Sequence, residues 1–180
     1  MFKNVISFLA GAVLAAVAVI LFMPSGKKVE SKAIKPSEIV YSTTRTQDYF
    51  FPTHNNLLVM DRAYAEIAEV FVVEVEPNKF THRHIHNDTE QLYYVLSGEG
   101  KVEVERNGVS EYHTIRPTEL VHIPRDCWHQ TFCAGDESLR YLAIDCFPDG
   151  KNPAEPTWDD HAQAICVMNQ WDYDESRIRN

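Results

Sequence analysis

Two histidines, His84 and His86, are spaced two residues apart in a segment that favours a β-strand, so both imidazoles are expected on one face. Gln91 follows in the next expected strand and shares a face there with Tyr93. His129 comes much later in the chain, just after a turn-forming stretch that begins at Pro124. Imidazole ligands suit divalent metals such as Fe, Mn, Zn or Ni. We therefore predict one divalent ion held by His84, His86, Gln91 and His129.

The elements that must position these residues are short strands. Turn residues separate apolar or alternating runs. Asn107-Gly108 favours a tight hairpin between two of them. No helical period interrupts the series, which indicates an all-β antiparallel sandwich or barrel. The expected strands are residues 70–75, 91–96, 101–105, 120–123, 129–133 and 140–146.

The C-terminal tail after Phe147 has a different character. Three prolines between residues 148 and 156 predict an extended crossing. Thr157 is a typical N-cap, and we expect a short helix from about Trp158 to Met168. We expect this helical tail to pack on the outside of the barrel.

The spacing of the candidate metal ligands resembles that of the cupin superfamily. The first cupin motif is His-x-His, three or four residues, Glu, six residues and Gly, and here His84 and His86 are followed by four residues, Gln91, six residues and Gly98. The second motif, Pro-x-Gly-x-x-His, is similar to the stretch from Pro124 to His129. The resemblance implies a single-domain jelly-roll barrel of the RmlC-like type with one divalent metal inside, often dimeric, so a homodimer is a candidate assembly.

The sequence departs from the cupin pattern at three positions. Asn78 and Asp126 stand where glycine is usual, and both residue types tolerate turn conformations better than most. Gln91 stands where most members have Glu. A rival set would use His82 and His84 with Glu90, but Glu90 faces opposite to Gln91 and leaves seven residues before Gly98. The spacing favours Gln91.

The neutral glutamine affects the chemistry that we expect. A metal held by three imidazoles and one amide keeps its full charge, which favours anion binding and Lewis-acid chemistry over oxygen activation. We predict an enzyme acting on a small organic acid or sugar derivative, as an isomerase, lyase or hydrolase, with a dioxygenase as the weaker reading. The alternative is a non-catalytic domain that binds or senses a small molecule. Tyr93 is the candidate catalytic residue, acting as an acid or an orienting group, unless it is only a wall aromatic.

The N-terminus differs in composition from the rest. Between Val5 and Met23 the only polar residue is Ser7, which predicts a single-pass transmembrane anchor over residues 1–23. We expect a tether and N-terminal arm over 24–60, the cupin barrel over 61–147 and the tail over 148–180. Basic residues just after the anchor favour a cytoplasmic domain. The chain has a net charge of −9, of which residues 1–35 contribute +4 and the rest −13, and so acidic a domain makes nucleic acid an unsuitable partner.

The four cysteines define no metal motif of their own. They show no C-x-x-C spacing, which excludes a zinc ribbon or a thioredoxin-like site. We expect ordinary buried thiols, and leave open a disulfide in an oxidising compartment. The cysteines are Cys127, Cys133, Cys146 and Cys166.

Overall fold

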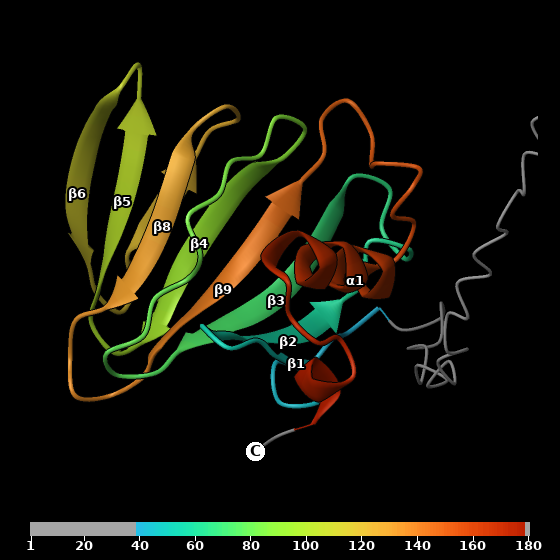
Figure 1. The fold of residues 1–180 in the computed structure, drawn as a ribbon, viewed down its shortest axis with the longest axis horizontal. Helices are drawn as coiled ribbons and strands as arrows, with labels where there is room; N and C mark the ends of the chain where they lie inside the picture. Colours follow the sequence, from blue (N-terminus) through green and yellow to red (C-terminus); the bar gives the residue numbers. More distant parts are fainter. Residues whose placement is uncertain (1–38, 179–180) are drawn as a thin grey trace, which may run out of the picture. The chain divides into compact units, whose positions relative to one another are not determined.

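The computed structural model describes residues 39–178, whose strands form two antiparallel sheets (Figure 1). The larger sheet has the order β1-β2-β3-β9-β4-β7 and the smaller one β6-β5-β8. With one short C-terminal α-helix, this arrangement fits the predicted all-β jelly roll. The strands are β1 (Gln47–Phe50), β2 (Asn55–Met60), β3 (Ala68–Val75), β4 (Glu90–Ser97), β5 (Gly100–Arg106), β6 (Val109–Ile115), β7 (Leu120–Ile123), β8 (Trp128–Cys133) and β9 (Leu139–Cys146).

The inner face of the large sheet mixes apolar and polar side chains. In β9, every second residue from Leu139 to Ala143 is buried, which is the period of a strand with one face in the core. Asp145 continues this buried face, so a carboxyl group occupies a core position. Asp145 pairs with Glu69 of β3 on one side and with Gln91 of β4 on the other. The strand register therefore sets three polar residues side by side in the interior.

Three tight turns use the residues that the sequence indicated. Asn107 and Gly108 have φ values of 52° and 78° and join β5 to β6, which confirms the predicted hairpin. Asn78 and Asp126 have φ values of 64° and 60°. Both therefore adopt the left-handed conformation that glycine provides most readily, which explains why Asn and Asp can replace it.

The first histidine segment is not the continuous strand that we predicted. Between β3 and β4 the described chain makes only two isolated bridges, Phe80 with Phe132 and His84 with His129. Side-chain hydrogen bonds replace part of the backbone hydrogen-bond ladder in this segment. The Thr81 hydroxyl, for example, accepts a hydrogen bond from the backbone N–H of Thr131. Two backbone hydrogen bonds, of 3.1 and 2.9 Å, still join His84 to His129. The two metal motifs are thus held together by the backbone itself.

The segment predicted as a tether and arm, residues 24–60, contributes β1 and β2 to the large sheet. The predicted transmembrane anchor, residues 1–23, lies outside the described residues. Among residues 39–178, no helix is both long and apolar enough to cross a membrane.

The predicted helix is present as α1 (Trp158–Asn169) and is followed by a 3₁₀ turn, η1 (Glu175–Arg177). Thr157 caps α1, and its hydroxyl and the Asp160 carboxylate bond reciprocally to backbone N–H groups. Contrary to our expectation, α1 does not pack only on the outside. Trp158 is 1% exposed and its ring lies 4.6 Å from that of Phe71 on the inner face of β3. In Figure 1, α1 lies over β3, where it closes one side of the barrel interior.

Candidate metal centre

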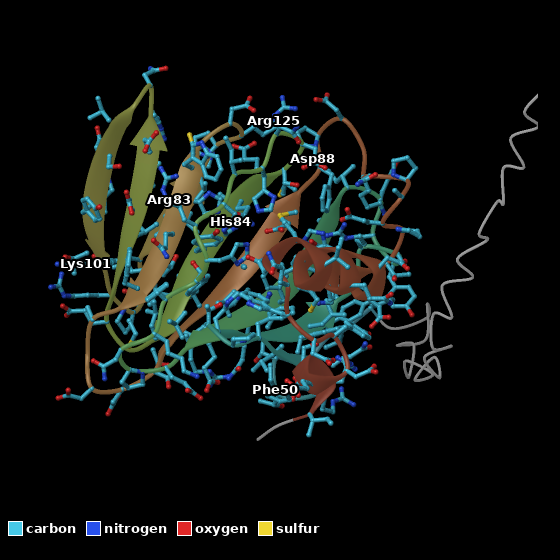
Figure 2. The ribbon with its side chains drawn as sticks, viewed as in Figure 1. Phe50, Arg83, His84, Asp88, Lys101 and Arg125 are labelled. Atoms are coloured by element: carbon cyan, nitrogen blue, oxygen red, sulfur yellow. The ribbon has the colours of Figure 1, made fainter. Side chains whose placement is uncertain are left out.

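Three histidines converge inside the barrel. The candidate ligand atoms of His84, His86 and His129 all lie within 4.8 Å of one another. The ring centroids are 4.2 Å apart for His84 and His129, and 4.9 Å apart for His84 and His86. Figure 2 shows His84 in the middle of the molecule, near β8 and β4. Three imidazole nitrogens at this separation could surround one divalent ion.

Backbone carbonyls fix which nitrogen two of the three rings present. His84 Nδ1 lies 2.8 Å from the carbonyl oxygen of His82, and His129 Nδ1 lies 2.9 Å from that of Cys127. A carbonyl only accepts, so each Nδ1 carries the proton and each Nε2 presents a lone pair. His129 Nε2 is buried and has no hydrogen-bond partner among the described residues. An orphaned lone pair beside two more imidazoles fits a bound cation.

Burial keeps these imidazoles neutral. Loss of solvent lowers the pKa of His86 to about 3 and that of His129 to about 4, and it holds the pKa of His84 well below the usual value. The neighbouring histidines add to the effect for His84 and His86. All three rings are therefore neutral at neutral pH, and neutral imidazole is the form that binds a metal.

Gln91 is 4% exposed and is held at both ends of its amide. The Tyr93 hydroxyl donates to Gln91 Oε1 at 2.6 Å, and Gln91 Nε2 donates to Asp145 Oδ1 at 2.9 Å. Burial raises the pKa of Tyr93 well above its usual value, so the phenol stays protonated and remains a donor. Oε1 keeps a second lone pair. Metal ligation by Gln91 stays a prediction, but the amide orientation that it needs is provided by two side chains.

A buried charge network lies behind Gln91. Glu69 accepts two hydrogen bonds from the Arg62 guanidinium, at 2.6 and 2.7 Å, and both residues are at most 2% exposed. Burial, together with the nearby Glu69 carboxylate, raises the pKa of Asp145 well above its usual value. Burial therefore favours the protonated form of the Asp145 carboxyl group. The carboxyl group of Asp145 thus lies behind the Gln91 amide and contacts it directly.

The rival ligand set is not assembled. Glu90 points away from the cluster of His84, His86 and His129. It pairs instead with His122 on the outer face, and both side chains are about half exposed. His82 lies beside His84, with ring centroids 4.5 Å apart, but is not part of the histidine cluster. The four cysteines are free thiols and lie outside the cluster as well.

A cavity of about 150 Å³ adjoins the histidine cluster. Its wall is formed by inward-facing strand residues, by the segment that carries the histidines, and by α1, which contributes Trp158, His161, Ile165 and Met168. Sequence reasoning missed the contributions of α1 and of His54, which is 6% exposed and also lines the cavity. One feature of the sequence pointed to His54, namely its position between aromatic residues and the residues of the following strand.

His54 should make the stability of the chain sensitive to acid. Burial lowers its pKa to about 3 in the folded state, while an unfolded histidine titrates near its ordinary value of 6.5. The unfolded state therefore binds the proton first, and stability is lost as the pH falls from 6.5 towards 3. As the pH falls from 5.5 to 4, the free energy of unfolding of the metal-free chain should fall less steeply in His54→Gln than in the wild type. The two slopes should differ by about 1.4 kcal/mol per pH unit. Urea titrations at several pH values measure this, and equal slopes would contradict it.

Comparison with known proteins identifies the class. Residues 71–145 match the family model of the Cupin domain. The chain therefore carries a cupin domain, which confirms the resemblance inferred from the two histidine motifs. No curated protein matches the sequence.

Solved structures agree at the level of the fold. Oxalate decarboxylase of Lactobacillus farciminis in its formate complex is 17% identical, with a TM-score of 0.53 over 75% of this chain and 41% of that one. A predicted oxalate decarboxylase of Thermotoga maritima is 15% identical, with a TM-score of 0.54 over 61% of this chain and 99% of that one. Drosophila melanogaster CENP-C bound to CAL1 is 16% identical, with a TM-score of 0.52 over 59% and 84%. The chain thus spans about two fifths of the Lactobacillus enzyme.

Proposed function

We propose that this protein is a cupin enzyme that binds one divalent metal and acts on a small organic acid or sugar derivative. The observation that carries the proposal is the cluster of neutral imidazoles beside a cavity, half-buried at His84 and His86 and buried at His129, whose Nε2 has no partner in the described part of the chain. Oxalate decarboxylases among the structural neighbours are consistent with an organic-acid substrate, through the fold alone.

His84, His86 and His129 would hold the metal, with Gln91 Oε1 as a fourth ligand. When bound, the ion would supply Lewis-acid chemistry, because a neutral ligand set leaves its charge undiminished for a chelating carboxylate or enolate. Tyr93 uses its proton to hold Gln91, which supports the orienting role among the two predicted for it. Trp158 and Ile165 of α1 give the cavity part of its apolar wall.

The test is metal content followed by turnover. The purified full-length chain should contain about one divalent ion and should consume a member of a panel of small carboxylates and sugar acids. Stoichiometric metal with specific binding but no turnover would favour the alternative, a non-catalytic binding or sensing domain. The absence of metal under every loading condition would contradict both. Homodimer formation, which the family resemblance implies, stays a prediction that light scattering can measure.

Gln91→Glu should change two affinities in opposite directions. The new carboxylate adds Coulomb attraction, so the metal should bind about tenfold more tightly or better. The loss of one unit of positive charge should weaken an anionic ligand by a similar factor. Glutamate has nearly the same size as glutamine, so the contact of the Tyr93 hydroxyl with the side-chain oxygen can be kept.

Calorimetry of the metal and of the best carboxylate measures both effects of Gln91→Glu. Misfolding would weaken both affinities, and Gln91→Leu provides a matched control that weakens metal binding without adding charge. Unchanged affinities in Gln91→Glu would mean that Gln91 does not contact the metal.

We further propose that residues 1–23 anchor the protein to a membrane, with the domain on the cytoplasmic side. The support is the apolar run from Val5 to Met23 and the lysines that follow it. The full-length chain should enter the detergent phase in phase partition, whereas a chain that begins at Ser37 should stay in the aqueous phase. Insolubility of the truncated chain would contradict the tether.

A further inference from the structure

The cavity beside the histidine cluster is lined by residues whose buried polar atoms have no hydrogen-bond partner in the part of the chain that the structure describes. Asn56 Oδ1, His82 Nδ1 and Trp158 Nε1 have no hydrogen-bond partner among the described residues, and all three residues line the cavity. Asn56 is 4% exposed and Trp158 is 1% exposed. Polar groups this deep in a protein are nearly always paired, so each unpaired one points to a missing partner.

These residues come from three separate parts of the fold. Asn56 lies in β2, opposite Val73 of β3. Trp158 begins α1 and packs on Phe71, the next inward-facing residue of β3. His82 lies beside His84, with ring centroids 4.5 Å apart. We call the histidine cluster the metal end of the cavity. Asn56 and Trp158, which lie against neighbouring inward-facing residues of β3, are called its polar end.

The chemistry of the two side chains at the polar end defines what they can bind. An indole N–H can only donate a hydrogen bond, and an amide Oδ1 can only accept one. A hydroxyl group does both and can satisfy both atoms, whereas a methylene group satisfies neither. Neither Lys nor Arg is among the described residues that line the cavity, and His161, which does line it, already pairs with Glu155 through Nδ1. The metal end is therefore the better partner for an anionic group.

We propose that the ligand is a small hydroxy acid, with its carboxylate at the metal end and a hydroxyl group between Asn56 and Trp158. This deepens the proposed function and rests on it. The cavity volume of about 150 Å³ lies below the roughly 300–1,000 Å³ of sites for drug-sized ligands, which fits a molecule of few carbons. Trp158 is thereby a specificity-determining residue that α1 contributes to the site.

The experiment compares acids that differ by one hydroxyl group. Glycolate and acetate, 3-hydroxypropionate and propionate, and the malate enantiomers and succinate are titrated into the metal-loaded full-length chain. In at least one pair the hydroxy acid should bind about tenfold more tightly or better. Trp158→Phe keeps an aromatic ring against Phe71 but removes the N–H, and Asn56→Leu keeps the size but removes the acceptor. Each variant should reduce the preference several-fold and leave the affinity for the deoxy acid nearly unchanged.

The outcomes separate this inference from the function on which it rests. A preference that survives both variants arises by chelation at the metal and overturns the inference. Equal affinities within every pair, or no binding of any hydroxy acid to the metal-loaded chain, also overturn it. Failure of the chain to bind metal at all contradicts the proposed function instead. The thermal midpoint of each variant, and the survival of deoxy-acid binding, show that lost preference is not lost folding.

Discussion

Replacing His129 with alanine should reduce metal affinity by more than about 100-fold, beyond the usual effect of losing a residue that only supports a ligand. His129 is 1% exposed, its Nδ1 is committed to the Cys127 carbonyl, and its Nε2 has no partner in the described part of the chain. His84→Ala and His86→Ala should have similar effects, because each ring belongs to the same cluster. Calorimetry or competition with a chromophoric chelator measures the affinities.

His82→Ala is the matched control for these variants. His82 is also a histidine of the same segment, but its contribution to His84 comes from its backbone carbonyl, which alanine retains. The metal affinity of His82→Ala should therefore stay within about tenfold of the wild-type value. That is the lower end of the range found when a residue that supports a metal ligand is altered. If His82→Ala abolishes binding while His86→Ala does not, the rival ligand set is correct.

Arg62→Met should destabilise the fold strongly at neutral pH. Arg62 is the buried partner of Glu69, through two hydrogen bonds of 2.6 and 2.7 Å, and it also lies over the Phe147 ring at 5.2 Å. Removing one member of a buried ion pair leaves an uncompensated charge and costs about 3–5 kcal/mol. For a chain of this size, the corresponding fall in thermal midpoint is roughly 6–20 °C. Calorimetry of the metal-free chain measures it.

An exposed ion pair provides the control for Arg62→Met. Arg83 and Glu105 form an ion pair whose side chains are 37% and 28% exposed. Arg83→Met should cost about 1 kcal/mol or less. Equal losses in the two variants would contradict a structural role for the Arg62 network.

The histidine cluster could be predicted from the sequence because local spacing and a family motif both point to it. Residues two apart share a face of extended chain, which brings His84 and His86 together. The resemblance to the second cupin motif added His129, which the structure places opposite His84. The strands and α1 could be predicted for the same reason, since alternation and the Thr157 cap are local signals. The extended segment at His84 proved to be a pair of bridges, because side-chain hydrogen bonds there replace part of the ladder.

The surroundings of the cluster depend on long-range register, which local patterns do not contain. Glu69, Asp145 and Gln91 lie side by side only because β3, β9 and β4 pair in one particular register. Taken singly, each acidic residue in a strand suggests a solvent-facing position. The approach of Trp158 to the cavity likewise depends on where the C-terminal tail crosses the barrel.

The X-ray absorption spectrum of the zinc-loaded full-length chain tests the central claim most directly. Imidazole nitrogens bind zinc at about 2.0–2.1 Å and thiolate sulfur binds it at about 2.3 Å, so the two ligand types are distinguishable. The spectrum should show about three imidazoles and no sulfur around a single ion, and His129→Ala should lose this signal. A shell without imidazole scattering, or one that contains sulfur, would contradict a metal centre built on His84, His86 and His129.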